Sequence, residues 1–310
     1  IFSGGVGGAK LALGLYLEQS SEELLVIGNV GDDFNHWGLH ISPDLDTLMY
    51  TLAGVADPDR GWGRAQESWT VLDTLSDLGG IDWFRLGDRD LAVHLERSVR
   101  MGEGETLSMV TRHLCRAFGV TATLVPPTND EVRTMVDTTD RTLSFQEYFV
   151  RERCEPLVTG LLYQGASQAT LLPEIGRSLA GDRLEAVILS PSNPYLSLDP
   201  ILEIADLRHR LAASPAPVVA VSPLIQSQAF KGPTAKIMME LGFAVSTLTV
   251  AQHYADILDG IVIDPADREL SGAIADLGIK VWITDTNMAN EQDKRRLAAE
   301  VISFSETIAG

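Results

Sequence analysis

The first 29 residues of the chain read IFSGGVGGAKLALGLYLEQSSEELLVIGN (1–29), and this stretch decides the fold prediction. Two apolar residues (1–2) precede a glycine-rich turn, a helical pattern over 9–19 and a continuous apolar run at 23–29. A strand, a helix and a second strand in this order form a βαβ unit, the building block of a parallel sheet. The chain begins at Ile1 without methionine, and we expect the first strand to extend upstream of it.

The same rhythm recurs along the chain. Continuous runs of Val, Ile and Leu are typical of parallel strands that are covered on both faces. The alternation of such runs with helical patterns predicts an α/β fold with a doubly wound, mostly parallel sheet in three layers. The further predicted strands are 185–190, 217–222, 260–264 and 279–284, and the predicted helices are 9–19, 68–78, 88–99, 106–117, 199–212, 232–241, 250–258 and 290–308.

The middle of the chain has a different pattern. Residues 119–165 are rich in β-forming side chains and contain few helical signals. We interpret 119–165 as an inserted β-rich subdomain, and 1–118 together with 166–310 as the α/β core.

Composition limits the possible partners and compartments. The 310 residues carry a formal net charge of −19, so a uniformly basic face for nucleic acid is not expected. Cys115 and Cys154 form no disulfide framework and no C-x-x-C metal pair, which favours a reduced, cytoplasmic setting. No apolar run approaches the roughly 18 residues of a membrane span, and we find no signal peptide, so no membrane partner is expected.

The glycine-rich turn contains Gly4, Gly5, Gly7 and Gly8, followed by Lys10. Bare backbone at the start of a helix can bind phosphate through its N–H groups, and Lys10 could contact the same anion. Alternatively, the glycines allow a helix to pack closely on a strand, and the lysine is a solvated surface residue. The sequence matches neither the P-loop pattern nor the complete dinucleotide fingerprint, so neither nucleotide class is supported.

An acidic stretch follows the second predicted strand. It reads NVGDDFNHWGLHISPDLDTLMY (29–50) and contains Asn29 and four aspartates. Carboxylates at a strand end are the oxygen ligands that Mg²⁺ prefers, usually together with phosphate oxygens. Helix capping is the alternative explanation, but it accounts for one aspartate rather than four. We therefore predict a metal or substrate role for this cluster, whose aspartates are Asp32, Asp33, Asp44 and Asp46.

Three further polar stretches are candidates for the same site. Arg89 lies at a loop-to-helix junction, where it could grip a phosphate in bidentate fashion or form a surface ion pair. Ser192 and Asn193 follow the strand at 185–190 in a proline-stiffened turn, which could orient a ligand or merely connect two elements. Lys231 opens a later helix and is a candidate second anion contact.

Most of these stretches come directly after a predicted strand. In open α/β sheets, ligands bind beyond the carboxyl ends of the strands, so one composite site is expected there. Four of the five tryptophans lie within the first ninety residues, which fits core packing or a planar aromatic ligand stacked near this part.

Eight motifs in order resemble the 2-phospho-L-lactate transferase family (CofD/FbiA type) of coenzyme F-420 biosynthesis. The resemblance runs from the first residues to about 260 and weakens beyond. One departure concerns Gln226, Ser227 and Gln228, which stand where relatives often have Gly-Gly. The motifs are SGGVGGAK (3–10), NVGDD (29–33), SPDLDT (42–47), DPDRGWG (57–63), LGDRDLA (86–92), SFQEYFVRER (144–153), SPSNPYLSLDPIL (190–202) and KGPTAKIM (231–238).

The resemblance implies a Rossmann-like fold, usually homodimeric, and a specific Mg²⁺-dependent reaction. The terminal ribityl hydroxyl of the deazaflavin Fo attacks the phosphorus that bears a small acid in a guanylylated phospho-acid. GMP leaves, and a phosphodiester joins the acid to Fo. The acid is 2-phospholactate, phosphoenolpyruvate or a similar compound.

On this resemblance, each candidate residue receives a role. Asp32, Asp33 and Asp46 are expected to bind Mg²⁺, and either Asp32 or Asp33 to take the ribityl proton. The expected substrate-binding residues are Gly4, Gly5, Gly7, Gly8, Lys10, Asn29, Asp46, Arg89, Ser192, Asn193 and Lys231. Two alternatives stay open: another Mg²⁺-dependent nucleotidyl or phosphoryl transferase, and a non-catalytic nucleotide- or flavin-binding protein.

Overall fold

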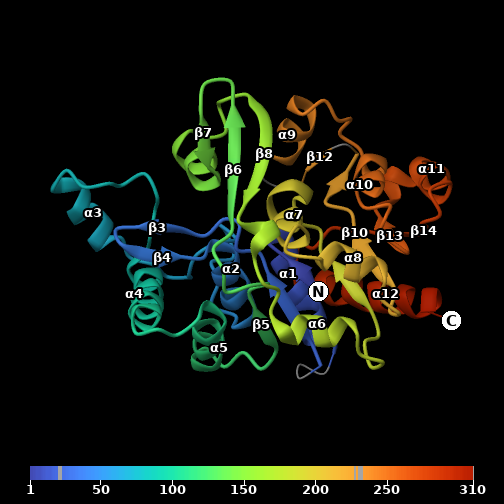
Figure 1. Cartoon of the computed structure of the whole chain (residues 1–310), viewed down its shortest axis with the longest axis horizontal. Helices are drawn as coiled ribbons and strands as arrows, with labels where there is room; N and C mark the ends of the chain where they lie inside the picture. The colour runs from blue at the N-terminus through green and yellow to red at the C-terminus, as the bar shows by residue number, and fades with distance from the viewer. Residues whose placement is uncertain (20–22, 227, 230–232, 310) are drawn as a thin grey trace.

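A seven-stranded parallel sheet forms the centre of the computed structural model (Figure 1). The structure describes residues 1–19, 23–226, 228–229 and 233–309. The strand order is β14-β13-β10-β9-β1-β2-β5, and every neighbouring pair is parallel. The strands are β1 (Phe2–Ser3), β2 (Leu25–Gly28), β5 (Thr123–Val125), β9 (Val187–Leu189), β10 (Val218–Val221), β13 (Gly260–Ile263) and β14 (Lys280–Ile283).

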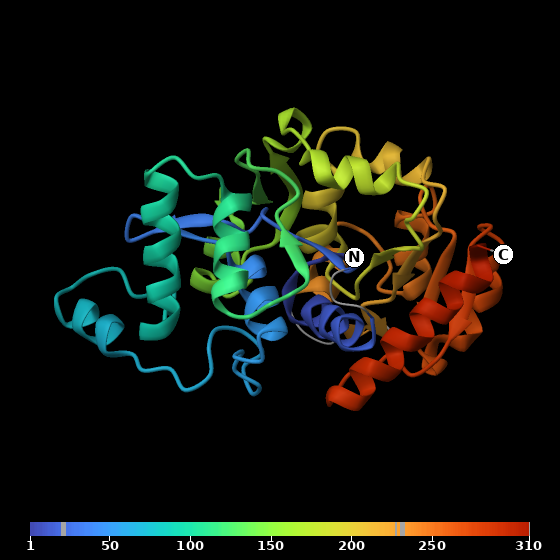
Figure 2. The same ribbon diagram turned by 90° about the horizontal axis from the view of Figure 1, so that it is seen from below.

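Helices cover both faces of this sheet, as the continuous apolar runs predicted. In β10, Val219 packs with the helices α1 (Gly5–Glu18) and α12 (Glu291–Ala309) on one face. Its neighbour Ala220 belongs to the core on the other face, with side chains of α7 (Asp199–Leu202), α8 (Leu207–Ala212) and α10 (Thr247–His253). Figure 2 shows α1 in blue alongside α12 in red. The predicted three-layer α/β fold is confirmed.

Most predicted helices have counterparts with shifted ends, but the predicted helix 199–212 is two helices, α7 and α8, separated by a turn at 203–206. Helix α1 begins at Gly5 and not at residue 9, because the first turn tolerates glycines that intrinsic propensity disfavours in a helix interior. Three α-helices of the described residues, at 43–52, 173–179 and 271–275, lie outside these predicted ranges. The remaining helices are α2 (Pro43–Leu52), α3 (Thr70–Asp77), α4 (Asp88–Gly102), α5 (Leu107–Ala117), α6 (Pro173–Leu179), α9 (Thr234–Glu240) and α11 (Ser271–Ala275).

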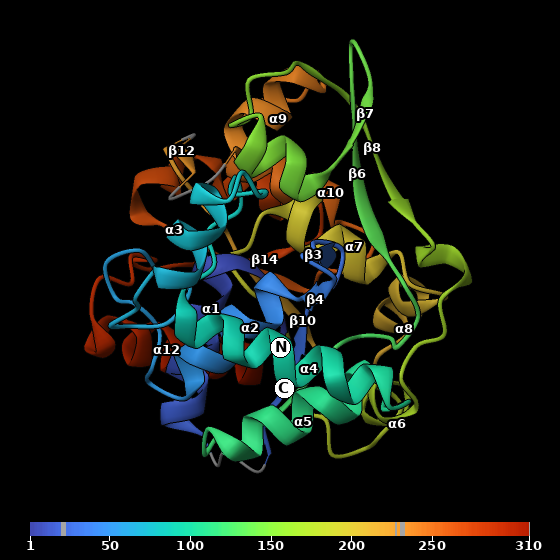
Figure 3. The same cartoon turned by 90° about the vertical axis from the view of Figure 1, so that its left-hand side faces the viewer.

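A separate antiparallel sheet rises from the core (Figures 1 and 3). It consists of β7 (Thr142–Ser144), β6 (Arg133–Thr138) and β8 (Val158–Gln164), in that order. The predicted boundary of the insertion at 119 is wrong, because β5 pairs with β2 as the edge strand of the main sheet. A short apolar strand of this kind has the same local pattern in either sheet, so the sequence could not place it.

Two smaller features lie outside these two sheets. The hairpin of β3 (Phe34–His36) and β4 (Leu39–Ile41) follows β2, and α3 lies apart from the sheet, at the left of Figure 1. Within the described ranges, no helix is both long and apolar enough to cross a membrane.

Candidate active site at the switch point of the sheet

The order of the strands places one switch point between β1 and β9. From β1 the chain continues towards β2 and β5, whereas β9 leads towards β10, β13 and β14 in the opposite direction. Ligands of open α/β sheets bind at the carboxyl ends of the strands at such a point. The glycine-rich turn follows β1 and the polar turn of Ser192 and Asn193 follows β9. The tertiary structure therefore brings these two predicted stretches together.

The glycines allow the two turns to touch. A Cβ atom on Gly7 would meet the carbonyl oxygen of Pro191 at 2.6 Å, and one on Gly4 would lie 2.8 Å from the Ser197 methylene. A Cβ atom on Gly8 would overlap three hydroxyl groups, those of Ser3, Ser190 and Ser192. Close packing, one of the two explanations open at the sequence level, therefore accounts for these three glycines.

Two amides of the turn already have partners within the protein. Gly5 has φ = +64°, a conformation that favours glycine, and its N–H donates to Oδ1 of Asp44 at 2.8 Å. Gly4 donates to Oγ of Ser192 at 3.2 Å. The other amides of the first turn of α1 lack intrahelical partners, as in every helix, so an anion would meet the turn there.

Asn29 joins two buried carboxyl groups. Its Nδ2 donates to Oδ1 of Asp32 at 2.9 Å, to Oδ2 of Asp44 at 3.0 Å and to the carbonyl of Leu196 at 3.2 Å. Burial raises the pKa of Asp44 to about 6. Burial and the charge of Asp44 raise the pKa of Asp32 well above its ordinary value. The neighbouring protein groups therefore do not offset the negative charge of these two carboxylates when both are ionised.

Asp33 follows Asp32 in the sequence, and only one of its two carboxylate oxygens is hydrogen-bonded within the described residues. Its Oδ2 accepts hydrogen bonds from Oγ of Ser42 at 2.7 Å and from Nε2 of His40 at 3.0 Å. Its Oδ1 is buried and has no hydrogen-bond partner among the described residues. A buried acceptor without a donor is costly to maintain, so this atom is a candidate for binding or proton transfer.

Asp46 belongs to a different cluster. The guanidinium group of Arg97, which is 1% exposed, binds both of its carboxylate oxygens. His94 contacts Asp46 at 3.6 Å and Asp90 at 3.4 Å, and the hydroxyl of Tyr50 donates to Asp90 at 2.6 Å. Asp46, Asp90 and His94 have the spacing of a metal site, but Arg97 already supplies a positive charge there. The structure thus brings Asp44, and not Asp46, beside Asp32.

A pocket of about 60 Å³ opens beside this second cluster. Its lining includes acidic side chains, aromatic side chains and an arginine, and the lining residue Trp62 is 41% exposed. Such a lining suits a planar, polar ring system. The lining residues are Ile41, Pro43, Asp46, Thr47, Tyr50, Trp62, Gly63, Phe84, Arg85, Leu86, Asp90 and His94.

The remaining predicted residues lie in several places. Ser192 is buried, and Asn193 caps the turn after β9 by accepting from the amides of residues 195 and 196. Nζ of Lys10 donates to the carbonyl of Met288 at 3.0 Å. Arg89 is exposed, with Nη1 3.4 Å from the carbonyl of residue 65. Lys231 lies outside the described residues.

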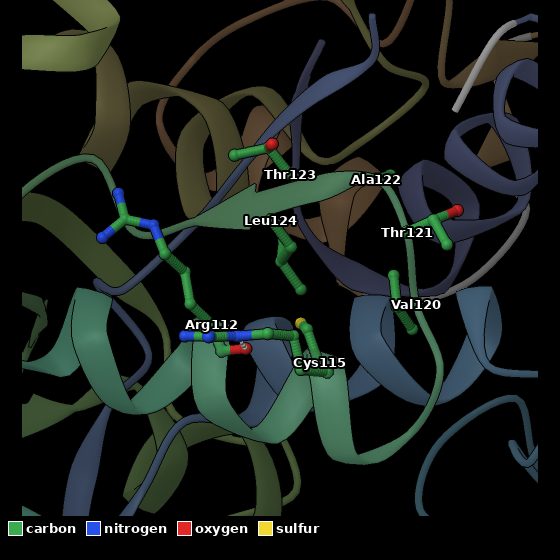
Figure 4. Close-up of a pocket in the computed structure, with 8 residues that line it drawn as sticks. Arg112, Cys115, Val120, Thr121, Ala122, Thr123 and Leu124 are labelled. Atoms are coloured by element: carbon green, nitrogen blue, oxygen red, sulfur yellow. Dashed lines mark hydrogen bonds between the residues drawn. The ribbon is translucent and has the colours of Figure 1, made fainter. Parts of the chain in front are cut away.

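A second pocket, of about 200 Å³, lies away from the switch point, between α5 and β5 (Figure 4). It is lined by Arg112, Cys115, Arg116 and the segment 120–124. Arg112 is already paired with Glu174, and burial raises the pKa of Cys115 to about 12. No candidate site residue from the sequence lines this pocket.

Sequence reasoning included Asp44 in the acidic cluster but not among the expected Mg²⁺ ligands, and it missed the partners of Asp46. One signal was present: Asp90, His94 and Arg97 follow one another at spacings of four and three residues, which places them on one face of α4. That their face meets Asp46 of α2 depends on tertiary packing, which no local pattern reports.

Comparisons with known proteins identify the family. The family model "2-phospho-L-lactate transferase CofD" matches residues 1–302. A phosphoenolpyruvate transferase of Kitasatospora aureofaciens is 36% identical over 99% of this chain and 97% of its own length. A 2-phospho-L-lactate transferase of Methanosarcina mazei is 35% identical over 97% and 98%. A phosphoenolpyruvate transferase of Thermobifida fusca is 38% identical over 98% and 97%.

A solved structure supports the fold alone. The UPF0052 family member from Bacillus halodurans has a TM-score of 0.59 at 12% identity and covers 97% of this chain and 96% of its own. The family match and the curated relatives span almost the whole chain, which therefore belongs to the CofD family of 2-phospho-L-lactate transferases.

Proposed function

We propose that this chain transfers a small phospho-acid from its guanosine-diphosphate-linked form to the ribityl hydroxyl of Fo and releases GMP. The observation that carries the proposal is the convergence, at one switch point, of a glycine turn, two electron-rich buried carboxyl groups and a polar turn. Phosphoryl transfer depends on positioning and charge neutralisation more than on covalent chemistry. The names of the relatives support phosphoenolpyruvate and 2-phospholactate as the candidate acids.

The donor would lie against the first turn of α1. Its diphosphate would meet the amides of that turn, with Ser192 and Asn193 at the side of β9 and Lys231 as a further predicted contact. Gly4 and Gly5 act indirectly in this proposal, since their amides fix Ser192 and Asp44. A protein of such negative net charge needs this local arrangement of donors to bind an anionic substrate.

The donor set fits Mg²⁺. Asp32 and Asp44 are buried and close together, and both have raised pKa values. A divalent cation between them would supply positive charge and lower both pKa values again. Asp32 and Asp44 are the residues that would hold it, with Asp44 replacing Asp46 in the predicted set, which leaves Asp33 for proton transfer. When bound, the ion would neutralise charge on the phosphate oxygens.

Asp33 is the residue that we assign to proton transfer. Its Oδ1 could accept the proton of the ribityl hydroxyl as that oxygen attacks phosphorus. His40 and Ser42, bonded to its other oxygen, keep the carboxylate oriented. Because His40 is partly exposed, the proton has a route towards solvent.

The acceptor would bind at the pocket beside Asp46. The cavity of about 60 Å³ is smaller than a tricyclic ring, so Fo would sit across its open mouth, against Trp62 and Phe84. Asp46, held by Arg97, would accept a hydrogen bond from the ring system. Arg89 lies in the first turn of α4, the helix that carries His94 and Arg97, and is kept as a predicted contact.

The test is incubation of purified protein with Mg²⁺, Fo and each guanylylated acid, with GMP and the coupled product read by mass. GMP release that requires both Fo and Mg²⁺ would support the proposal. Release of GMP without Fo would indicate another nucleotidyl or phosphoryl transferase. Binding of nucleotide or Fo without turnover would indicate a non-catalytic binding protein.

Assembly as a homodimer is proposed from the family resemblance. Light scattering of the protein after size-exclusion chromatography gives its mass directly. A mass near twice 33.6 kDa would support a dimer, and a mass of one chain would exclude it.

A further inference from the structure

The polar turn after β9 makes hydrogen bonds both with the carboxyl cluster of the site and with side chains on its opposite side. Residues Pro194–Leu198 form a single π-helical turn that leads directly into α7. On its inner side, the carbonyl of Leu196 accepts from Asn29, the residue that joins the two carboxyl groups of the site. π-helical turns are rare and often occur at functional sites.

On the outer side, a histidine from a distant helix binds the end of the turn. His253 is the last residue of α10, and its Nε2 lies 2.9 Å from both carboxylate oxygens of Asp199. The Asp199 side chain is 7% exposed and the His253 side chain 26% exposed. The His253 ring also packs against Tyr195, with centroids 5.0 Å apart. Figures 1 and 3 show α10 beside α7.

Two tyrosine hydroxyls bind carbonyl oxygens of the same turn. Tyr163 of β8 donates to the carbonyl of Tyr195 at 2.6 Å and lies 3.4 Å from Oδ2 of Asp199. Tyr254, next to His253, donates to the carbonyl of Pro194 at 3.3 Å. Side chains from two distant parts of the chain thus bind one short turn from outside the carboxyl cluster and the pocket beside Asp46.

We propose that His253 is a positioning residue for the donor: through Asp199 it holds the turn 193–198, which in turn holds Asn29 and Asn193 in place. The proposal rests on the proposed function for its kinetic consequence, but not for its structural one. Because the turn lies on the donor side of the site, loss of the His253–Asp199 contact should weaken donor binding and leave the acceptor pocket unaffected.

The kinetic test compares His253→Ala with His253→Gln, whose amide can donate to Asp199 as Nε2 does. We expect His253→Ala to raise the KM for the guanylylated donor by about tenfold, the scale of a lost charge-assisted hydrogen bond, with the KM for Fo unchanged. His253→Gln should restore most of the donor KM. Arg210→Gln, which removes the exposed ion pair of Arg210 with Asp206 on the adjacent α8, is the control and should match wild type.

Hydrogen exchange of the substrate-free protein separates this proposal from the proposed function. Amides of the 193–199 segment should exchange faster in His253→Ala than in wild type, and His253→Gln should reverse this. If wild type shows no transfer activity, the proposed function fails and the exchange result alone decides on the positioning role. Unchanged exchange, equal shifts in both KM values, or no rescue by glutamine would overturn it.

Discussion

Replacing Asp44 by asparagine should change how the stability of the protein depends on pH. Burial raises the pKa of Asp44 from 3.8 to about 6. A difference of one in pKa corresponds to about 1.4 kcal/mol, so ionisation of this carboxyl in the folded protein costs about 3 kcal/mol. The sign follows from the raised pKa: the folded state binds the proton more tightly. The contribution of protonated Asp44 to the stability of the fold is fully present below pH 3.8 and is lost as the pH rises through about 6.

Asp44→Asn removes this titration but also places an amide opposite the amide of Asn29, at a constant cost of about 1–3 kcal/mol. The pH dependence is therefore a cleaner observable than stability at one pH. Between about pH 4 and pH 7, the unfolding free energy of wild type minus that of the variant should fall by about 2 kcal/mol.

The assay is urea unfolding followed by circular dichroism at several pH values, with a chelator present to remove divalent cations. Asp57→Asn is the control, because Asp57 is partly exposed and the backbone N–H of Arg60 lowers its pKa. Its difference curve should not fall as pH rises. Parallel curves for wild type and Asp44→Asn across this range would refute the reasoning about the buried carboxyl pair.

Three further changes have expected outcomes. Asp32→Asn should abolish turnover and leave the melting temperature equal or higher, since it removes a buried charge; unchanged kcat would remove Asp32 from the proposed metal site. Arg97→Met should destabilise the fold by about 3–5 kcal/mol in urea, because it leaves Asp46 buried and unpaired; a loss below about 1 kcal/mol would contradict this. Gly8→Ala should cost about 1–3 kcal/mol by overlap with three serine hydroxyls, whereas Gly102→Ala, with open space around it, should not destabilise. Equal stability of the two glycine variants would disprove the packing argument.

The local pattern of the chain was sufficient for the architecture. The strands at 25–28, 187–189, 218–221, 260–263 and 280–283 lie within predicted apolar runs, because both faces of a parallel sheet are buried and the sequence shows this directly. The ordered motifs were likewise sufficient for the family, which the match over residues 1–302 confirms. Boundaries were less well predicted, as β5 and the start of α1 show.

The sequence by itself determined the order of the strands, the glycine-rich turn and the acidic residues along an α/β chain. Hydrophobic periodicity and turn-forming residues are local properties, so they can be read without the tertiary structure. Only the tertiary structure decided which acid faces which partner. Asp44 and Asp46 are two residues apart on α2, so they lie on different faces of one helix. One therefore meets Gly5 and Asn29, and the other meets Arg97 of a helix about fifty residues further along. Side-chain partners of this kind depend on how helices pack, which is a long-range property of the fold.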